Sequence, residues 1–437
     1  MSNKVKPRTI SGVLELLPND QIIFNQMVDK IRKAYESFGF LPLDTPIIEL
    51  SEILLAKAGG ETEKQIYRFQ KGDNDLSLRF DLTVPFAKYV SMNQNELAFP
   101  FRRYQIGKVY RGERPQKCRF REFYQCDVDV ISDKLDIMND AEMVNVIYET
   151  FKSLDLAKFT ICINNRKILN GFFEALDISN QKVEILRIID KIDKMGEEAM
   201  RQELDKIGVA SEKINQICDF ILITGSTDEM IAKLKEMEVQ NEVFLEGLSE
   251  IEKVASYVKQ FEIPEDYFRL DLKIARGLDY YTGTVYETFF DEYRNLGSVC
   301  SGGRYDNLTE YYTERSFQGV GISIGLSRLY AQLKEMGLIK TTMNSIAKVL
   351  VVPMDEEVSG FALKLAKKLR ENKINTEIYS NFYKDMKSKL KYADKLNISY
   401  VCIIGENEMN ENCVMLKNMK EKSQEKVKFE DILASLK

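Results

Sequence analysis

Apolar residues near the start of the chain recur with the period of an α-helix. One face of such a helix would hold Ile22, Ile23, Met27, Ile31, Ala34, Tyr35 and Phe38. Asn19 or Asp20 is a candidate cap at its start, and Gly39 and Pro42 are residues of the kind that end helices. The pattern predicts an amphipathic helix over residues 19–38, followed by a strand-like segment.

Between about Leu76 and Val130 the pattern changes to alternation of apolar and polar residues, which is typical of half-buried strands. It predicts antiparallel strands over SLRFDLTV, FRRYQIGKVYR and REFYQCDVDV, with the polar GERPQKC as a loop before the last of them. A helix is predicted over residues 137–152 and a strand over residues 159–163. Charged helices with regularly spaced Leu and Ile then predict a helical insertion between about residues 166 and 260.

Strand character returns after the helical segment, from Phe268 to Phe290 and again around GSVCSGGRYD. The passage GVGISIGLSRLYAQLKEMG predicts a strand that runs into a helix. After a linker at residues 340–347, the strand patterns KVLVVP, INTEIYS and SYVCIIG alternate with the helix patterns FALKLAKKLREN and KDMKSKLKYADKLN, and FEDILASLK is expected as a closing helix. Regular alternation of this kind predicts an independent α/β domain.

Length and composition limit the class of protein. With 437 residues, of which 44% are hydrophobic, the chain is long enough for two or three domains with full cores. The seven cysteines are scattered and never spaced as C-x-x-C, which argues against a disulfide framework or a zinc site and fits a reducing cytoplasm. The start MSNKVKPRTI lacks the features of a secretory or transit peptide, and no apolar run is long enough to span a membrane.

Charge and the missing histidine restrict the chemistry. The net charge of −6 excludes a uniformly basic nucleic-acid-binding surface but leaves room for a local basic face. The chain contains no histidine, which is the side chain most used as a base at neutral pH and as a metal ligand. Any catalysis must therefore rest on carboxylates, arginines, backbone dipoles or a bound cation.

Two predicted strands joined by a loop carry several arginines, in VYRGERPQK and RFREFYQCDVDV. Alternate residues of a strand share a face, so Arg119, Arg121, Phe123 and Gln125 would point the same way. Guanidinium groups beside an aromatic ring suit a polyphosphate attached to a flat base, because the guanidinium fork matches phosphate oxygens. The alternative is a solvated, charged hairpin.

The run LRFDLTVPF places Asp81 and Thr83 on one face of a predicted strand that is otherwise apolar. A carboxylate in that position is costly unless it is paired, and the ammonium group of a ligand is one possible partner. An equally good interpretation pairs Asp81 with Arg79 at an exposed edge.

The glycines of GVGISIG lack the G-x-G-x-x-G spacing of a dinucleotide-binding loop, and no P-loop sequence occurs in the chain. They are better explained as positions where a helix and a strand pack closely. Arg328, just inside the predicted helix, lies near its positive end and needs an anionic partner there. The run ARGLDYYTGTVYE adds Arg276, Asp279, Tyr280 and Tyr281 to a segment of strand character.

Together these stretches resemble the histidyl-tRNA synthetases, a family of class II aminoacyl-tRNA synthetases, over nearly the whole chain. Pro46 in LDTPIIE resembles the proline of motif 1 at the dimer interface, VYRGERPQKCRFREFYQCDVDV resembles motif 2, and GVGISIGLSRL resembles motif 3. IARGLDYYTGTVYE and SGGRYDNL are similar to two stretches peculiar to the histidine enzymes.

The resemblance implies a fold and its division into domains. It implies an α+β catalytic domain built on an antiparallel sheet, with a helical insertion and a C-terminal α/β domain that is similar to anticodon-binding domains. The catalytic domain is expected at residues 1–165 and 263–340, the helical insertion at residues 166–262, and the anticodon-binding-like domain at residues 346–437.

The resemblance also implies an ATP site. The residues implied there are Arg111, Glu113, Arg119, Phe123, Arg276 and Arg328. Arg111 and Arg276 would act on the α-phosphate as the catalytic residues, and Arg119 and Arg328 would face the outer phosphates. Adenine would lie against Phe123 and Glu113. ATP would come with Mg²⁺, and no residue of the chain is assigned as a metal ligand.

A histidine site is implied beside the ATP site. The residues implied there are Asp81, Thr83, Gln125, Asp129, Arg276, Tyr280 and Tyr281. The first three would contact the ammonium group, while Asp129 and the two tyrosines would surround the imidazole. Asp127 offers a second carboxylate near the imidazole, and the alternation of the strand, which puts Asp129 on the face of Arg119 and Gln125, favours Asp129. At Tyr124 the family often has a histidine, but this side chain is expected to point away from that face.

The activity implied by the resemblance is the ATP-dependent activation of histidine to histidyl-adenylate and its transfer to the 3′ end of tRNA(His), by a cytoplasmic homodimer. A regulatory paralogue from histidine biosynthesis and a stress-sensing pseudo-synthetase are alternatives. Such paralogues typically lack the anticodon domain or the ATP arginines, and both are present here. In the C-terminal domain, a basic face toward tRNA would be formed by Lys364, Lys367, Lys368, Arg370, Lys384, Lys387, Lys389, Lys391 and Lys395. Two ordinary lysine-rich amphipathic helices are an equally good interpretation of these residues.

Overall fold

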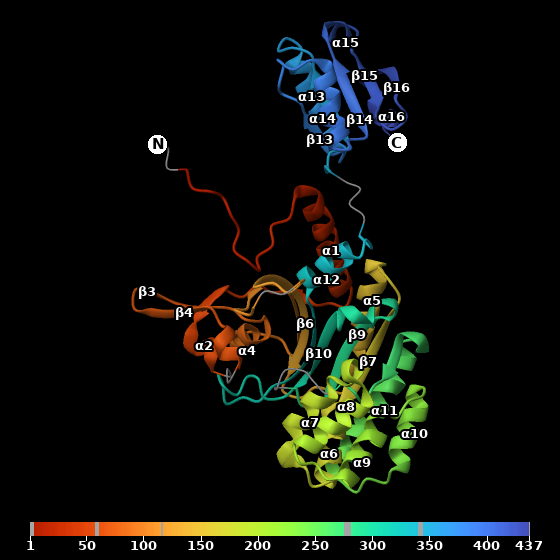
Figure 1. Ribbon diagram of the computed structural model, residues 1–437. Coiled ribbons are helices and arrows are strands. Elements are labelled where there is room, and N and C mark those ends of the chain that lie inside the picture. The colour runs from red at the N-terminus through yellow and green to blue at the C-terminus, as the bar shows by residue number, and fades with distance from the viewer. Residues whose placement is uncertain (1–3, 57–60, 115–116, 275–280, 340–343, 437) are drawn as a thin grey trace. The chain divides into compact units, whose positions relative to one another are not determined.

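The computed structural model describes residues 4–56, 61–114, 117–274, 281–339 and 344–436 (Figure 1). Contacts divide the chain into two compact units, Met1–Leu14 with Met27–Leu338 and Glu15–Gln26 with Ile339–Lys437. In the described part of the chain, no helix is long and apolar enough to cross a membrane. All seven cysteines are free thiols, and six of them are buried.

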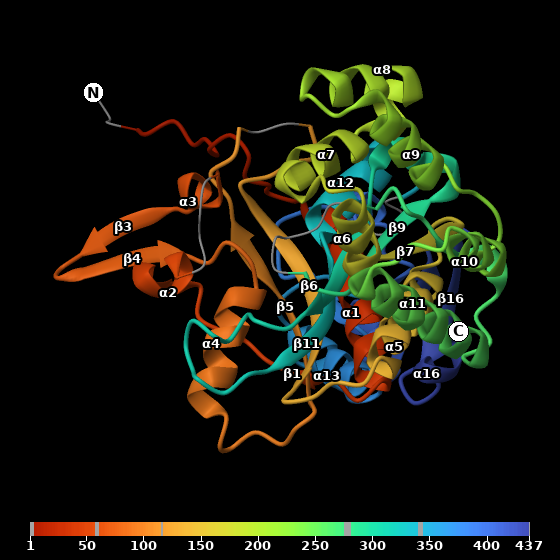
Figure 2. The ribbon, with the colours of Figure 1, turned by 90° about the horizontal axis from the view of Figure 1, so that it is seen from below.

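An eight-stranded sheet forms the centre of the larger unit (Figures 1 and 2). Its strands, in spatial order, are β1 (Leu41–Pro42), β5 (Phe101–Tyr110), β6 (Glu122–Ser132), β11 (Gln318–Ile324), β10 (Cys300–Tyr305), β9 (Thr284–Phe290), β7 (Phe159–Asn165) and β8 (Phe268–Leu270). The outermost pairs, β1 with β5 and β7 with β8, are parallel, and all pairs between them are antiparallel. This sheet confirms the predicted α+β architecture.

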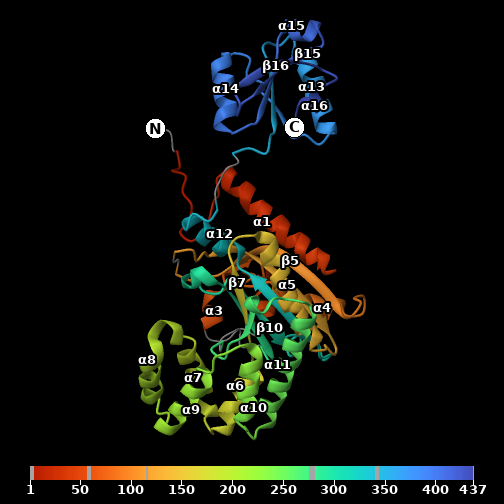
Figure 3. The same cartoon turned by 90° about the vertical axis from the view of Figure 1, so that its right-hand side faces the viewer.

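One face of the sheet is covered by α1 (Pro18–Ser37), α5 (Met138–Leu154) and α12 (Leu326–Glu335). The Tyr35 hydroxyl of α1 donates to the carbonyl oxygen of Cys126 at 3.1 Å, and Ser327 of α12 accepts the amide N–H of Tyr124 at 2.9 Å. Figures 2 and 3 show α1 and α5 side by side. The helix predicted over residues 19–38 is therefore confirmed, and Gly39, which has a φ of +76°, ends it in the left-handed region.

The opposite face packs against α4 (Thr83–Asn93). Phe86 and Val90 of this helix meet Phe101, Ile131 and Phe317 of the sheet side in one buried apolar cluster. Next to it lie a three-stranded sheet and two short helices: β2 (Ile48–Leu50), β4 (Asn74–Leu78), β3 (Arg68–Lys71), α2 (Ser51–Leu55) and α3 (Glu61–Gln65). The β3–β4 hairpin extends away from the large sheet (Figure 2).

The strand predicted over SLRFDLTV is wrong in its second half. β4 ends at Leu78, and Thr83 begins α4, so Asp81 and Thr83 do not share the face of a strand. The helix begins here because Oδ1 of Asp81 accepts the first free amide groups, from Thr83 at 3.2 Å and from Val84 at 2.9 Å.

Helices fill residues 166–260, as predicted (Figures 1 and 3). They are α6 (Arg166–Ala175), α7 (Lys182–Ile189), α8 (Ile192–Lys206), α9 (Ser211–Ile221), α10 (Thr227–Glu236) and α11 (Glu242–Gln260), with 3₁₀ turns at Ser179–Gln181 and Glu265–Tyr267. α6 and α11 pack backbone to backbone, since a Cβ atom on Gly171 would lie 2.3 Å from the amide nitrogen of Phe244. A further 3₁₀ turn, Asp291–Leu296, follows β9.

The smaller unit contains a five-stranded sheet: β13 (Thr376–Ile378), β12 (Val349–Pro353), β14 (Tyr400–Ile404), β15 (Cys413–Asn418) and β16 (Ser423–Lys428). The first three strands are parallel, as expected for alternating strands and helices. Its helices are α13 (Ser359–Glu371), α14 (Met386–Lys395), α15 (Glu406–Asn410) and α16 (Ile432–Ser435). The antiparallel hairpin β15–β16 was not predicted, and the closing helix is shorter than the predicted one.

Candidate active site

Polar side chains from three neighbouring strands share the face of the large sheet that α4 partly covers. In one row across the strands, Arg103 pairs with Asp129, and Asp129 pairs with Gly321. In the next row, Gln105 pairs with Asp127, and Asp127 pairs with Ser323. Directly paired residues point to the same face, so these two rows form a polar floor inside an otherwise apolar sheet.

Asp129 is held by two partners on this floor. Nη2 of Arg103 lies 2.6 Å from its Oδ2, and the Tyr305 hydroxyl donates to its Oδ1 at 2.9 Å. Burial raises the pKa of the Asp129 carboxyl, and the charge of Arg103 opposes that shift. Arg103 itself is fully buried and lies 4.3 Å from the ring centroid of Phe86. Arg103 was not predicted as a site residue, although an arginine at an inward strand position in FRRYQ is a usable signal.

The glycines of GVGISIG make room for side chains of the neighbouring strands. A Cβ atom on Gly321 would lie 2.2 Å from Oδ1 of Asp129, and one on Gly319 would lie 2.3 Å from the ring of Tyr305. The explanation as close packing of a helix on a strand is therefore wrong. These positions require glycine because a carboxylate and a phenol ring pass directly over them.

Asp127 is the carboxylate of the floor that keeps an open acceptor. Its side chain is 3% exposed, and within the described ranges its Oδ1 has no hydrogen-bond partner. Burial raises its pKa to about 7, although the charge of Arg103 and a hydrogen bond with Ser323 oppose the shift. Asp127 and Asp129 are two residues apart on β6, so the alternation of the strand puts both on this face and does not distinguish between them.

Gln125 adds a second open acceptor at the end of the floor. Its Nε2 donates to Oγ of Ser323 at 2.8 Å, while its buried Oε1 has no partner among the residues described. Oriented in this way, Gln125 leaves its carbonyl oxygen available to a further donor. The face predicted for Gln125 is thus the face of the two aspartates.

Asp81 lies at the start of α4 and is also buried. Burial raises the pKa of its carboxyl, and hydrogen bonds from the Val84 amide and the charge of Arg111 oppose this. The alternative pairing of Asp81 with Arg79 is wrong, because the Arg79 guanidinium donates to the carbonyl oxygens of Thr45 at 2.6 Å and Lys108 at 2.7 Å.

Within the described residues, this floor is rich in buried carboxylates. Three buried carboxylates, those of Asp81, Asp127 and Asp129, have pKa values raised mainly by burial. Two fully buried cations lie on this face, Arg103 beside Asp129 and Arg79 over Gly107 of β5, and the charge of Arg111 lowers the pKa of Asp81. Because burial outweighs the opposing arginine charges, a cation or a strong N–H donor would stabilise the anionic forms of these carboxyls.

Arginines and an aromatic ring lie where β5 ends and β6 begins. The guanidinium of Arg111 lies 4.3 Å from the ring centroid of Phe80 and 5.2 Å from that of Phe123. Arg119 and Glu113, in the loop between the strands, form a partly exposed ion pair at 3.8 Å. The solvated hairpin considered as an alternative therefore does not describe Arg111, which stacks between two rings.

Arg328 projects from the first turn of α12. Its Nη2 donates to the carbonyl oxygen of Leu296 at 3.0 Å, and Gln332 of the same helix donates to that oxygen at 3.1 Å. The guanidinium is thus oriented by the turn that follows β9.

Tyr281 lies against the floor and is fixed by the strand that contains SGGRYD. A Cβ atom on Gly303 would lie 2.8 Å from the Tyr281 ring. The next residue, Thr282, donates its amide N–H to the Arg304 carbonyl at 2.9 Å and its hydroxyl to Oδ2 of Asp306 at 2.5 Å. Gly303 pairs with Gly321, so the ring and the Asp129 carboxylate lie over adjacent glycines of one row.

The Arg304 side chain anchors the same strand on the other face. Its guanidinium forms a buried ion pair with Asp140 of α5, with Nη2 2.5 Å from Oδ2. The Tyr286 hydroxyl donates to the carbonyl oxygen of Asp140 at 2.9 Å. Arg276, Asp279 and Tyr280 of the predicted site lie outside the described residues.

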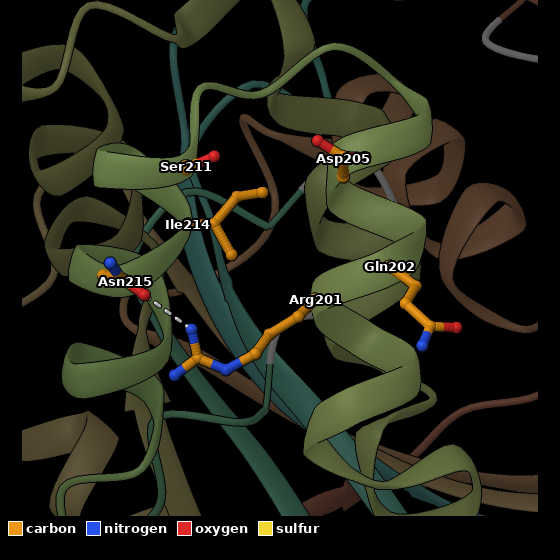
Figure 4. Close-up of a pocket in the computed structure, with 6 residues that line it drawn as sticks. All are labelled: Arg201, Gln202, Asp205, Ser211, Ile214 and Asn215. Carbon is orange, nitrogen blue, oxygen red and sulfur yellow. Dashed lines mark hydrogen bonds between the residues drawn. The ribbon is translucent and has the colours of Figure 1, made fainter.

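A separate pocket of about 240 Å³ lies between α8 and α9 (Figure 4). It is lined by Arg201, Gln202, Asp205, Ser211, Ile214 and Asn215. Arg201 crosses it and donates to Oδ1 of Asn215 at 2.7 Å. None of these residues belongs to the predicted site.

Comparisons with known proteins cover the whole chain. Residues 12–329 match a family model described as histidyl-tRNA synthetase, and residues 348–437 match one described as an anticodon binding domain. A histidine–tRNA ligase from Clostridium tetani is 55% identical over 435 residues, which cover 99% of this chain and 98% of that protein. One from Clostridium acetobutylicum is 47% identical over 434 residues, covering 99% and 100%.

Solved structures show the same relationship. The crystal structure of histidyl-tRNA synthetase from Nostoc sp. PCC 7120 is 39% identical, has a TM-score of 0.91 and is matched over 99% of both chains. A structure from Bacillus halodurans C, described as an ATP phosphoribosyltransferase regulatory subunit/histidyl-tRNA synthetase, is 21% identical with a TM-score of 0.75, over 92% of this chain and 100% of that one. The second likeness shows the fold alone.

Proposed function

The chain belongs to the histidyl-tRNA synthetase family, and we propose on that premise that it is a histidine–tRNA ligase. It activates histidine with ATP to histidyl-adenylate and transfers the histidyl group to the 3′ end of tRNA(His). The observation that carries this conclusion is the polar floor, whose three carboxylates are buried and whose acceptors on Gln125 and Asp127 have no hydrogen-bond partner among the described residues.

Histidine supplies a positive charge and N–H donors for the buried carboxylates and open acceptors of this floor. Its ammonium group brings a positive charge and three N–H donors, for which Asp81, Thr83 and Oε1 of Gln125 are the proposed partners. Its imidazole brings a further N–H donor. For the imidazole we propose Asp129, Tyr280 and Tyr281, with Arg276 nearby, and we add Asp127.

Asp127 and Asp129 are proposed to have different roles because their hydrogen-bond partners differ. Both oxygens of Asp129 are engaged, by Arg103 and Tyr305, so this carboxylate mainly contributes negative charge and shape. Oδ1 of Asp127 is open, so it is the better acceptor for an imidazole N–H.

ATP is proposed to bind at the mouth of this floor. Adenine would lie on Phe123 beside Glu113, with Arg111 and Arg276 on the α-phosphate and Arg119 and Arg328 toward the outer phosphates. Across the described ranges, no group of three acidic, cysteine or histidine side chains could hold a metal ion. Mg²⁺ is proposed to bind together with ATP, because this ion is usually held by substrate phosphates, water and one or two carboxylates.

The first step needs no base from the protein. The histidine carboxylate is already an anion and attacks the α-phosphorus, and pyrophosphate leaves. The protein aligns the two substrates, and Arg111 and Arg276 stabilise the charge that grows on the α-phosphate. In the second step the tRNA ribose hydroxyl attacks the carbonyl carbon of the adenylate, a phosphate oxygen of the adenylate accepts the hydroxyl proton, and AMP leaves. Both steps suit a chain without histidine.

A homodimer is proposed on the basis of exposed apolar residues near motif 1. They are Leu41, Ile47, Ile48, Leu50 and Phe69, and they lie on or beside the short strands β1, β2 and β3. Exposed apolar residues at the edges of sheets are typical of an interface between proteins.

The finer division of the chain also remains a proposal. We propose a catalytic domain at residues 1–165 and 263–340, a helical insertion at residues 166–262 and an anticodon-binding domain at residues 346–437, in a cytoplasmic enzyme. No observation favours the regulatory paralogue considered as an alternative.

Charging of tRNA(His) with labelled histidine tests the proposed function. The ligase should form histidyl-tRNA only when ATP is present. A protein that binds histidine with micromolar affinity and forms no histidyl-tRNA would be a regulatory paralogue, and the proposal would be wrong.

A further inference from the structure

An exposed tyrosine marks the loop between β13 and α14 in the smaller unit. The Tyr383 side chain is 99% exposed, more than any other large apolar or aromatic side chain that the structure describes. A single exposed apolar residue is common on protein surfaces and carries little by itself. Its surroundings make this one informative.

Three exposed lysines accompany Tyr383. Lys384 is its neighbour in sequence, and Lys387 and Lys391 lie one turn apart on α14. Within the described residues none of the three forms an ion pair with a carboxylate, whereas Lys367 pairs with Glu371. The carboxylate nearest in sequence, Asp385, is occupied as the cap of α14 and accepts the amide N–H of Ser388 at 2.9 Å.

Lys389, on the same helix, does not belong to this surface. Its side chain is buried, and its amine donates to the carbonyl oxygen of Pro353 at 3.1 Å. Burial lowers its pKa. Of the lysines on α14, Lys389 thus lies in the core, and Lys387, Lys391 and Lys395 are exposed.

The loop also lies at the end of the sheet where ligands usually bind. β12 and β13 are parallel, and the loop follows the carboxyl end of β13. The turn between β15 and β16 lies at the other end, because Asn418, the last residue of β15, pairs with Tyr400, the first residue of β14. Exposed lysines in that turn, such as Lys420, therefore provide a matched control.

We propose that Tyr383 is a stacking platform for one unpaired base of the tRNA anticodon loop, with Lys384, Lys387 and Lys391 bound to the phosphates around it. An exposed aromatic ring beside unpaired cations is the arrangement that recognises single-stranded nucleic acid, because every base has a π-face and every nucleotide a phosphate. This proposal rests on the proposed function. Stacking contributes affinity for an unpaired base without selecting its identity.

The test uses the full-length protein with the variants Tyr383→Ala and Tyr383→Phe. Equilibrium binding is measured with intact tRNA(His) and with transcripts that each carry one abasic position in the anticodon loop. Tyr383→Ala should weaken binding of intact tRNA by between about 5-fold and 150-fold, and Tyr383→Phe, which keeps the π-face, should change it by less than about twofold. At one abasic position the effect of Tyr383→Ala should disappear.

The lysines are tested through salt dependence. Lys387→Gln should make the slope of log Kd against log salt concentration shallower by roughly 0.7 to 1, while Lys420→Gln should leave it unchanged. Equal tRNA affinity of Tyr383→Ala and wild type, or a loss that persists at every abasic position, would overturn the platform.

Failure of the proposed function gives a different result. Histidine-dependent ATP–pyrophosphate exchange should be the same in Tyr383→Ala and wild type, because the substitution is far from the polar floor in sequence and fully exposed. Absence of exchange in the wild type would refute the ligase, whereas normal exchange with unaltered tRNA affinity in Tyr383→Ala would refute only the platform.

Discussion

Replacing Asp127 with asparagine tests the polar floor most sharply, because it removes a charge and keeps the shape. The open Oδ1 of Asp127 is proposed to accept an imidazole N–H. A hydrogen bond to a charged group contributes about 1.5 to 3 kcal/mol, so Asp127→Asn should weaken histidine binding by about 10-fold to 150-fold at pH 8. The affinity for ATP should not change.

The pH dependence provides an independent check. With a pKa of about 7, the Asp127 carboxyl is mostly ionised at pH 8 and mostly neutral at pH 6. The ratio of histidine affinities, wild type over Asp127→Asn, should therefore fall by up to about tenfold between pH 8 and pH 6. Taking the ratio cancels the titration of histidine itself. Calorimetry with both proteins measures it, and Asp133→Asn, an exposed carboxylate paired with Arg315, is the control.

At pH 8 the free energy of unfolding should favour Asp127→Asn over wild type, which is the opposite order to that of their histidine affinities. The pKa of Asp127 is higher in the folded protein, about 7, than the ordinary 3.8, so folding is favoured by its neutral form. That contribution is complete below about pH 4 and is lost as the pH rises to about 7, at a cost on the order of 4 kcal/mol. Asp127→Asn should be more stable than wild type at pH 8. Equal histidine affinities with parallel pH curves would refute the role of Asp127.

Three further substitutions address the neighbouring contacts. Thr282→Val removes the hydroxyl group that donates a hydrogen bond to Asp306. In exchange kinetics it should raise KM for histidine about tenfold or less and leave KM for ATP unchanged. An equal rise for both substrates would contradict a role through Tyr281. Arg103→Met leaves Asp129 as an unpaired buried charge and should lower the free energy of unfolding by about 3 to 5 kcal/mol in denaturant titrations; a variant as stable as wild type would show that the pair is dispensable. Arg276→Ala should slow adenylate formation by roughly 100-fold in single-turnover experiments with little change in histidine binding, and unchanged turnover would remove its catalytic role.

Elements with a strong local pattern could be predicted from the sequence. β5 and β6 follow their alternation closely, and α1 follows its helical stripe to within one residue at each end. The run before α4 was predicted wrongly because a few alternating residues do not distinguish a strand from the start of a helix. The usable signal was Asp81 itself, a carboxylate that caps the first turn.

The hairpin β15–β16 left almost no signal in the sequence. β16 is an edge strand with one buried residue, Val427, so its residues show no apolar alternation. Its pairing with β15 is decided by the rest of the sheet rather than by its own side chains.

The polar floor was only partly predictable, because it depends on strand register. Gln125 and Asp129 were found, but the partner of Asp129 is Arg103, which lies on another strand. The roles of Gly319 and Gly321 likewise depend on which side chains cross them. A single sequence predicts which residues of a strand share a face, but not which residues of neighbouring strands pair with one another.

ATP–pyrophosphate exchange with each proteinogenic amino acid in turn tests the central claim most directly. The floor combines buried carboxylates, open acceptors and a tyrosine ring, and so we expect exchange with histidine alone. A site of such polar contacts should reject residues that lack a ring N–H by as much as about 10⁴-fold. Exchange driven equally well by another amino acid, or by none, would contradict the account.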